Sequence, residues 1–187
     1  MAEIWVTSDS HFNHENIIKY CGRPFDNALQ MNEYMVEKWN ATVKPQDKVY
    51  HLGDVYMGGG FDRDYTSSLL RSLAGKKRLI LGNHDNGKDQ LLQNNFQKIS
   101  IWRMFPEFGL LLTHIPVHEN SLLRGPSGNE QNSPKLRNIH GHIHEKVVEH
   151  IESRDGFTHK YVNKDYRCVC VEHLDYGLIN IEELRKW

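Results

Sequence analysis

Apolar residues along this 187-residue chain gather in short β-prone runs, and several of these runs end in polar residues. Residues 31–43 instead carry apolar side chains at helical spacing, and a second helix is expected at 64–73. A hairpin is expected over 146–163, because Asp-Gly stands between β-prone flanks. Strands, some followed by turns, are expected at 3–9, 47–55, 76–86, 97–105, 109–116, 135–144, 167–172 and 177–184, the last ending in a short helix.

The connecting segments show no domain boundary. Three successive glycines mark a loop at 56–62, and 117–135 is a long loop rich in Gly, Ser, Asn and Pro. Loops of that length inside a compact domain are usually functional or mobile. No linker or internal repeat divides the chain, so we expect residues 1–187 to form a single domain.

Composition limits the class of protein and the compartment. With 39% hydrophobic and 25% charged residues, the composition is typical of a globular protein. The formal net charge of −1 does not indicate the strongly basic surface of a protein that coats nucleic acid. The three cysteines show no CxxC spacing, which favours a reducing compartment, and Cys168 and Cys170 are expected to be buried. No apolar run reaches the length of a membrane span and no signal peptide is visible. We therefore expect a cytoplasmic protein with no membrane partner.

Polar clusters stand at the ends of five of the expected strands. In open α/β sheets, ligands bind beyond the carboxyl ends of the strands, so endings that are remote in sequence can converge on one site. Each ending alone is also typical of an ordinary polar turn. The five endings together, each following an apolar strand, favour a shared site. They are "SDSH" at 8–11, "GD" at 53–54, "GNHD" at 82–85, "TH" at 113–114 and "GHIH" at 141–144.

The residue types in these clusters suit a divalent metal. Asp9 and His11 are two residues apart, a spacing that puts both side chains on one face of an extended strand. Carboxylate, amide and imidazole together suit Mn²⁺, Fe²⁺ or Zn²⁺, and the lack of thiolates argues against a structural zinc site. Gly53, Gly82 and Gly141 are expected to permit tight turns and close approach of the backbone.

The order of these motifs resembles the calcineurin-like metallophosphoesterase superfamily between residues 7 and 144. The stretches "SDSHFNHENIIKYCGRPF" and "VYHLGDV" resemble its compact stand-alone bacterial and phage members, and the tail "CVCVEHLDYGLINIEEL" looks like their closing strands. The resemblance implies an α/β fold of two facing mixed β-sheets flanked by helices, an α/β/β/α sandwich. It also implies two divalent metal ions as cofactors, with manganese expected and iron, nickel or zinc as alternatives.

The resemblance further implies a role for each motif residue. Asp54 is expected to bridge the two metals. His84 is expected to contact the phosphate and to protonate the leaving oxygen, with Asp85 orienting its ring. The chain departs from many relatives in having no glycine before His114. The remaining ligands are expected to be Asp9, His11 and His144 on the first metal, and Asn83, His114 and His142 on the second.

Three residues outside the motifs are candidate substrate contacts. His14 follows the first motif closely, Arg23 lies in "GRPF", and His118 lies in the long loop. Bracing of a turn is the alternative role for Arg23, and plain solvation is the alternative for His118. His140, outside the Gly-His-x-His pattern, is expected to have a structural or supporting role.

The mechanism that these assignments imply is hydrolysis of a phosphate ester by a hydroxide that two metals activate, with a histidine as general acid. Phosphodiesters are favoured, because no dense arginine cluster near the motifs offers the cationic contacts that a monoester usually needs. The expected partner is a small phosphate ester such as a nucleotide or a short nucleic acid. The alternatives are a monoesterase acting on a nucleotide or phosphoprotein, a nuclease on long polymers, which the near-neutral charge opposes, and a non-catalytic scaffold, which the complete ligand set opposes.

Overall fold

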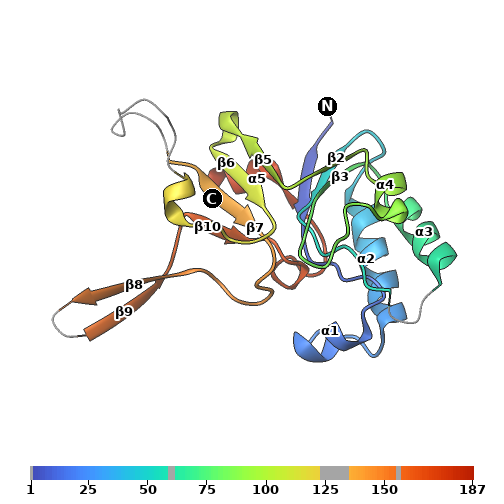
Figure 1. Ribbon diagram of the computed structural model, residues 1–187, viewed down its shortest axis with the longest axis horizontal. Helices are drawn as coiled ribbons and strands as arrows, with labels where there is room; N and C mark the ends of the chain where they lie inside the picture. Colours follow the sequence, from blue (N-terminus) through green and yellow to red (C-terminus); the bar gives the residue numbers. More distant parts are fainter. Residues whose placement is uncertain (1, 59–61, 123–134, 155–156) are drawn as a thin grey trace.

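Two β-sheets form the centre of the protein (Figure 1). The computed structural model describes residues 2–58, 62–122, 135–154 and 157–187. The first sheet has the strand order β11–β1–β2–β3–β4; β1 to β4 run parallel, and β11 pairs antiparallel with β1. Its strands are β1 (Ile4–Thr7), β2 (Lys48–His51), β3 (Lys76–Ile80), β4 (Lys98–Ser100) and β11 (Ile179–Asn180).

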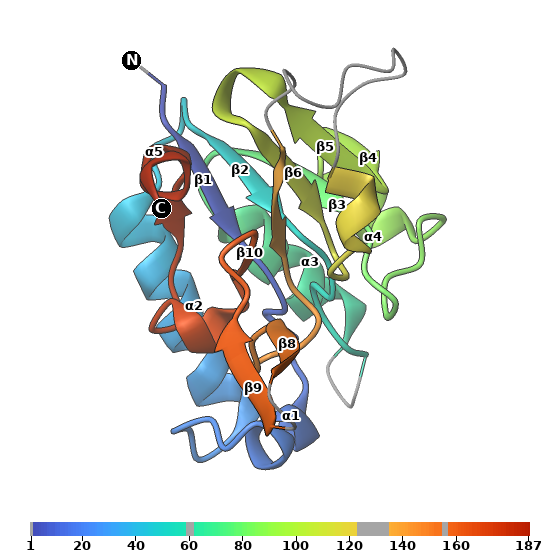
Figure 2. The ribbon, with the colours of Figure 1, turned by 90° about the vertical axis from the view of Figure 1, so that its left-hand side faces the viewer.

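The second sheet has the strand order β10–β7–β6–β5. Strands β10, β7 and β6 are parallel, and β5 pairs antiparallel with β6. Both sheets are therefore mixed, as the sequence reading expects, and β1, β2 and β6 point toward the same end of the molecule (Figure 2). The strands are β5 (Trp102–Phe105), β6 (Leu110–Thr113), β7 (Arg137–His140) and β10 (Tyr166–Cys168).

The strands of the first sheet bury side chains on both faces. In β2, Val49 packs toward the helices, whereas Tyr50 packs between the two sheets. Leu79 and Ile80 of β3 divide in the same way, because successive side chains of a strand point to opposite faces. Burial of the apolar layer between the sheets stabilises the fold. Its second-sheet members include Phe105, Leu110, Leu112 and Ile139.

Helices cover the outer face of the first sheet (Figure 1). The long helix α2 is capped at its N-terminus by Asn27, whose side chain accepts a hydrogen bond from the N–H of Gln30. It buries Met31, Met35 and Trp39 against the sheet. The helices on this face are α1 (Glu15–Tyr20), α2 (Ala28–Thr42), α3 (Arg63–Ser72) and α4 (Gln90–Asn95). The last helix, α5 (Ile181–Lys186), instead contributes Ile181 and Leu184 to the layer between the sheets.

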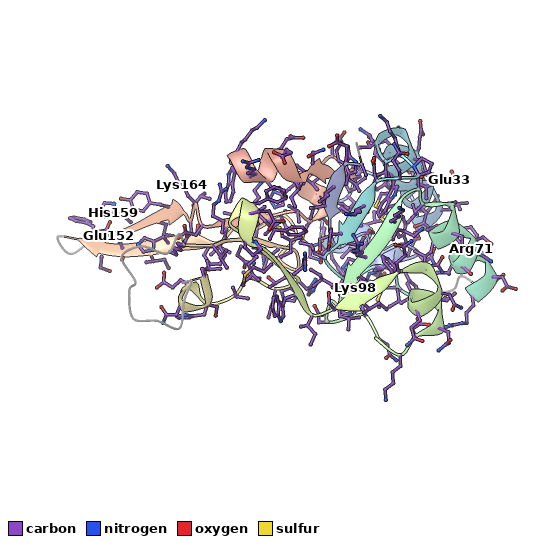
Figure 3. The ribbon with its side chains drawn as sticks, turned by 90° about the horizontal axis from the view of Figure 1, so that it is seen from above. Glu33, Arg71, Lys98, Glu152, His159 and Lys164 are labelled. Carbon is purple, nitrogen blue, oxygen red and sulfur yellow. The ribbon has the colours of Figure 1, made fainter. Side chains whose placement is uncertain are left out.

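The outer face of the second sheet carries a smaller apolar cluster. The 3₁₀ turn η2 (Glu119–Leu122) contributes Leu122 to it, beside Leu111 of β6 and Tyr166 of β10. The expected hairpin is present as β8 (Glu149–Arg154) paired antiparallel with β9 (Phe157–Val162), and its turn at 155–156 lies outside the described residues. It projects away from the two sheets (Figures 1 and 3).

Several sequence expectations about elements were wrong. Residues 97–105, expected as one strand, form β4 in the first sheet and β5 in the second, and the chain passes between the sheets at Ile101. Residues 167–172 are a strand only as far as Cys168, and the 3₁₀ turn η3 (Val171–His173) follows. The six-residue helices α1 and α4 were not predicted, because so short a helix shows little periodicity. None of the helices in the described ranges has the length and apolar character needed to cross a membrane.

Candidate metal centre

The motifs that the sequence singles out follow β1, β2 and β3 in the first sheet and β6 and β7 in the second. Parallel strands place their carboxyl ends at one edge of a sheet, so turns that are remote in sequence meet here. The side chains brought together are the seven predicted metal ligands, Asp9, His11, Asp54, Asn83, His114, His142 and His144.

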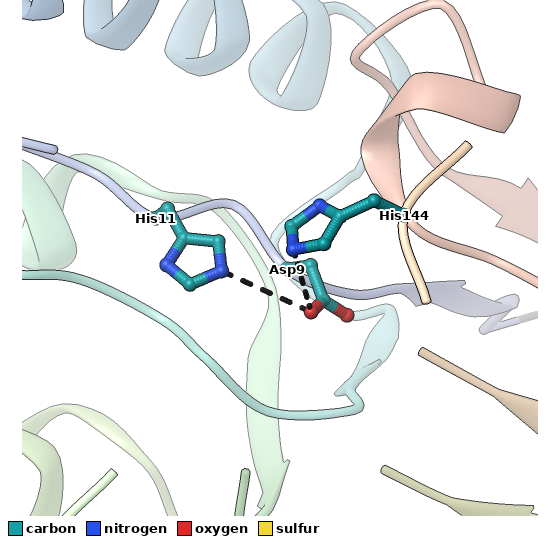
Figure 4. A group of neighbouring side chains, drawn as sticks. All are labelled: Asp9, His11 and His144. Atoms are coloured by element: carbon teal, nitrogen blue, oxygen red, sulfur yellow. Dashed lines mark ion pairs between the residues drawn. The ribbon is translucent and has the colours of Figure 1, made fainter. Parts of the chain in front are cut away.

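One group of ligand atoms comes from Asp9, His11 and His144, whose donor atoms lie within 4.8 Å of one another (Figure 4). The Nε2 atoms of both histidines lie 3.9 Å from Oδ1 of Asp9. The two imidazole rings stack with their centroids 5.3 Å apart. A buried carboxylate faced by two imidazole nitrogens is a donor set that suits a divalent transition metal.

A second group comes from Asp54, His114 and His142, again with donor atoms within 4.8 Å. Asn83 joins this group through its Oδ1, which lies 2.8 Å from Nε2 of His114 and 2.9 Å from Nδ1 of His142. The second group therefore combines carboxylate, amide and imidazole donors, as the sequence predicts.

The carboxylate of Asp54 faces both groups. Its Oδ2 lies 3.6 Å from Nε2 of His11 and 3.5 Å from Nε2 of His114. Its Oδ1 accepts a hydrogen bond of 2.9 Å from the backbone N–H of His84, which fixes the orientation of the carboxylate. A carboxylate held between two sets of imidazoles can serve two cations at once.

Hydrogen bonds on the far side of two imidazoles determine which nitrogen carries the proton. Nδ1 of His114 lies 2.7 Å from the carbonyl oxygen of Leu52, which can only accept, so Nδ1–H donates and Nε2 keeps its lone pair. Nδ1 of His144 lies 3.0 Å from Oε1 of Glu172, which assigns the proton in the same way. Both Nε2 lone pairs therefore point toward carboxylate or amide oxygens, an arrangement that a cation between them stabilises.

Buried polar atoms in the first group lack hydrogen-bond partners. Oδ2 of Asp9 accepts hydrogen bonds from the hydroxyl of Ser8 (2.5 Å) and the N–H of His142 (2.9 Å). Oδ1 of Asp9 and Nε2 of His11 have no partner in the part of the chain that the structure describes. Burial raises the pKa of Asp9 to about 6 and, with help from nearby positive charges, lowers the pKa of His11 to about 2. A divalent cation fits these residues, since it satisfies the buried carboxylate and the lone pair of a neutral imidazole.

The backbone of the ligand turns is left-handed. This finding corrects the expectation that Asp9 and His11 share a face of an extended strand, because β1 ends at Thr7 and the turn brings the two side chains together. The left-handed conformation costs an ordinary residue about 1–2 kcal/mol, although Asp, Asn and His adopt it more readily than most. Five of the eight non-glycine residues with positive φ in the described ranges are predicted ligands: Asp9 (58°), His11 (49°), Asp54 (56°), His142 (71°) and His144 (51°).

Two motif glycines let the ligand turns approach one another. A Cβ on Gly141 would lie 2.1 Å from Oγ of Ser8 and 2.2 Å from Oδ2 of Asp9. A Cβ on Gly82 would lie 2.1 Å from Oδ1 of Asp54. Only glycine fits at these positions, because a side chain would displace a carboxylate of the site.

His84 lies beside the ligand groups, and its side chain is exposed. Its ring centroid is 5.7 Å from that of His11. Asp85 does not orient His84 as expected. Its carboxylate accepts hydrogen bonds from the N–H groups of Gly82 (2.9 Å), Asp54 (2.9 Å) and Val55 (3.1 Å), so it joins the turns that follow β2 and β3.

The three candidate substrate contacts differ in position. His14 lies next to the first ligand group, with its ring centroid 5.5 Å from that of His11. Arg23 is buried, and its guanidinium donates to the carbonyl oxygens of Asp9 and Ser10 (both 2.8 Å) and to Glu172, so it braces the first turn and does not face a substrate. His118 is exposed, and its ring accepts a hydrogen bond from the N–H of Asn120.

Glu172 is a site residue that the sequence reading missed. It accepts hydrogen bonds from Nδ1 of His144 and from both Nε and Nη2 of Arg23, with the Nη2 contact at 2.7 Å. Burial alone would raise the pKa of Glu172, but the hydrogen bond from His144 and the charge of Arg23 lower it to about 2. No motif marks this residue, because it lies just after the strand that ends at Cys168 and reaches the site through η3.

Known proteins are similar to this chain in sequence or in fold. A solved structure from Aquifex aeolicus, described as the protein of unknown function AQ665, has a TM-score of 0.70 and 27% identity over 100% of this chain and 99% of its own. The Gene 66 protein of Mycobacterium phage L5 is 26% identical over 203 aligned residues, which cover 96% of this chain and 95% of the phage protein.

A third relative matches more closely over a shorter region. The uncharacterized protein MJ1445 of Methanocaldococcus jannaschii is 45% identical over 85 residues, which are 46% of this chain and 48% of that protein. The family model of the calcineurin-like phosphoesterases matches residues 2–166. This match includes all five strand-end motifs and the seven side chains that they bring together. The chain therefore belongs to the calcineurin-like phosphoesterase family, whose members use divalent metal ions.

Proposed function

We propose that this protein is a metal-dependent phosphodiesterase with a binuclear centre, and that manganese is its metal. The observation that carries the proposal is the position of Asp54, whose Oδ2 lies between the imidazole nitrogens of His11 and His114. Asp9 and His144 would complete one metal site, and Asn83 and His142 the other. When bound, divalent cations supply positive charge for the phosphate and make water a stronger acid. Residues 1–187 would act as one catalytic domain in the cytoplasm.

His84 would donate a proton to the leaving oxygen. Its imidazole is exposed beside the ligand groups, while its backbone N–H is fixed to Oδ1 of Asp54. The residue is therefore held in place by its main chain, and its ring is free to reach a substrate. General-acid help of this kind contributes about 10²–10⁴-fold in rate, most for esters with poor leaving groups.

A diester is favoured over a monoester because, within the described ranges, the arginines near the centre are already paired. Arg23 is bound to Glu172 and to backbone carbonyl oxygens. Arg63, which lines a cleft together with His84, forms an ion pair of 2.9 Å with Asp89. A monoester dianion would gain little from these neutralised charges, whereas a diester carries one negative charge less.

Hydrolysis of bis(p-nitrophenyl) phosphate tests the proposal. Protein stripped with a chelator should be inactive, and added Mn²⁺ should restore turnover. Asp54→Asn should lose both metal and activity, whereas Asp26→Asn, the same change at an exposed position, should lose neither. Turnover that persists after complete metal removal would refute a metal-dependent reaction.

A second comparison tests the role of His84. His84→Ala should retain bound metal but hydrolyse an alkyl aryl diester with a poor leaving group at least about 100-fold more slowly. The loss should be much smaller with p-nitrophenolate as the leaving group, since that group departs without a proton. An equal loss on both substrates would contradict proton donation by His84.

A further inference from the structure

A cleft on the outer face of the second sheet opens directly beside the metal centre. Its volume is about 570 Å³, within the range of small-molecule binding sites. Asn83 and His114, which belong to the second ligand group, also line this cleft. A phosphate held at the ligand groups would therefore lie at the mouth of the cleft.

The walls of the cleft are apolar. Trp102 and Met104 of β5 pair in register with Thr113 and Leu111 of β6, and all four side chains line one wall. The described residues that line the cleft include no Asp, Glu, Lys or Arg. A charged group that entered would lose its hydration without gaining an ionic partner, so the cleft suits an uncharged group.

Large apolar side chains around the cleft are unusually exposed. Trp102 is 57% exposed, Ile115 is 51% exposed, and Ile101, which also lines the cleft, is 74% exposed. Exposed apolar groups gathered around a hollow are typical of a binding surface. The indole of Trp102 offers a flat face on which a planar ring can stack, which favours an aromatic occupant over an alkyl chain.

We propose that the cleft binds an uncharged aromatic substituent of the phosphate ester, stacked on Trp102, and that the natural group of this chemistry is a nucleobase. The inference rests on the proposed function, because the phosphate must lie at the ligand groups for its substituent to enter the cleft. It names the substrate class as esters with an aromatic group close to the phosphate. A substituent bearing a further phosphate is disfavoured, since no Lys or Arg is among the described residues that line the cleft.

Calorimetric titration of the manganese-loaded protein with two monoesters tests the cleft without turnover. Phenyl phosphate and methyl phosphate carry the same charge and differ only in the ring. The wild type should bind phenyl phosphate roughly tenfold more tightly, the size expected from one stacking contact. Trp102→Ala should reduce the preference to about twofold or less. Tyr161→Ala is the matched control, since Tyr161 is an aromatic side chain 52% exposed on β9, and it should keep the tenfold preference.

The outcomes distinguish a failure of the cleft proposal from a failure of the proposed phosphodiesterase function. Equal affinities in the wild type, or a tenfold preference that survives Trp102→Ala, overturn the inference. Ile115→Ser provides a second variant and should also lower the preference. Sedimentation must show the same mass for the wild type and Trp102→Ala, because a drop in mass would mean that a second copy of the chain covers the cleft. Failure of metal-dependent diester hydrolysis, with the phenyl preference intact, would instead count against the proposed function alone.

Discussion

Replacement of Glu172 by glutamine should weaken both the fold and the affinity for metal. The carboxylate accepts hydrogen bonds from Nε (3.0 Å) and Nη2 (2.7 Å) of Arg23 and from Nδ1 of His144 (3.0 Å). Glutamine has nearly the same shape and keeps one accepting oxygen, but it carries no charge. The change therefore removes the negative partner of a buried guanidinium without opening a cavity.

The magnitude follows from the pKa of Glu172. The charge of Arg23 and the hydrogen bond from His144 overcome the cost of burial and lower this pKa from 4.5 to about 2. A shift of that size corresponds to about 3 kcal/mol in favour of the ionised form. Only 7% of the side chain is exposed, so solvent screens the interaction little. The free energy of unfolding of the metal-free protein should fall by up to about 3 kcal/mol at pH 6.

The difference in unfolding free energy between the wild type and Glu172→Gln should shrink both at low pH and at high pH. The pKa of Glu172 is depressed in the fold, so its contribution is present above pH 4.5 and is lost as the pH falls toward about 2. For His144, burial disfavours the charged ring, but the hydrogen bond and charge of Glu172 outweigh burial and raise the pKa above 6.5. Its contribution is present below pH 6.5 and is lost as the pH rises through the raised pKa. The difference should be largest between about pH 5 and 6.5.

Metal affinity should fall as well, because the Glu172 carboxylate fixes the ring orientation and tautomer of His144. Loss of such a partner typically costs about 10–100-fold in affinity. Urea denaturation of metal-free protein would measure the stability, and calorimetric titration with Mn²⁺ would measure the affinity. Glu33→Gln, the same substitution on the exposed surface of α2 (Figure 3), is the control and should change neither quantity.

A supporting role for the Glu172 charge is refuted if the unfolding free energy of Glu172→Gln lies within about 0.5 kcal/mol of the wild-type value and the variant binds Mn²⁺ equally well. A loss of stability that does not vary with pH would point to altered packing instead of a lost charge. A loss of stability with unchanged metal affinity would show that Glu172 supports Arg23 but not His144.

Three other substitutions test the packing of the site and the core. Gly141→Ala should abolish Mn²⁺ binding, measured by calorimetry, because the new methyl group would collide with the Asp9 carboxylate and the Ser8 hydroxyl. Asp85→Ala should lower the free energy of unfolding in urea by about 2–4 kcal/mol, since it leaves three backbone N–H groups without their acceptor. Leu112→Ala, at a fully buried position between the sheets, should cost about 2–5 kcal/mol in the same assay and leave the stoichiometry of metal binding unchanged. A Gly141→Ala protein that bound Mn²⁺ normally, or stability changes below about 1 kcal/mol in the other two variants, would contradict this packing of the site and the core.

The convergence of the ligand turns could be predicted from the sequence because each motif follows a strand, whereas the assignment of individual ligands came from the family resemblance. An apolar run followed by a polar turn marks both the element and its carboxyl end, and parallel strands bring such ends together. The crossing between β4 and β5 had no such mark. The run from Lys98 to Phe105 contains neither glycine nor proline, so its alternating pattern fits one strand as well as two in different sheets.

The roles of residues whose partners are backbone atoms were the hardest to predict. For Arg23 two roles were open, substrate contact or bracing of a turn, and the structure shows the second, whereas Asp85 was expected to orient a catalytic ring. Arg23 donates to two carbonyl oxygens in the turn that follows β1. Asp85 accepts hydrogen bonds from three N–H groups in the turns that follow β2 and β3. Backbone atoms are the same at every position, so no pattern of side chains identifies them as partners.

The energy of the ligand turns explains why such supporting residues are needed. Five predicted ligands have left-handed backbone, and even at about 1 kcal/mol each they cost about 5 kcal/mol, as much as the whole net stability of many domains. The metal-free fold must hold these turns in place before a cation can repay the cost. Arg23, Asp85 and Glu172 do so through hydrogen bonds that do not involve a metal, so the geometry of the centre is a property of the fold itself. Substitutions at these three positions should therefore lower the free energy of unfolding in the absence of metal. His142→Gly should do the opposite, because glycine adopts the left-handed backbone of this position without strain. The same variant should bind Mn²⁺ more weakly, because it has lost a ligand.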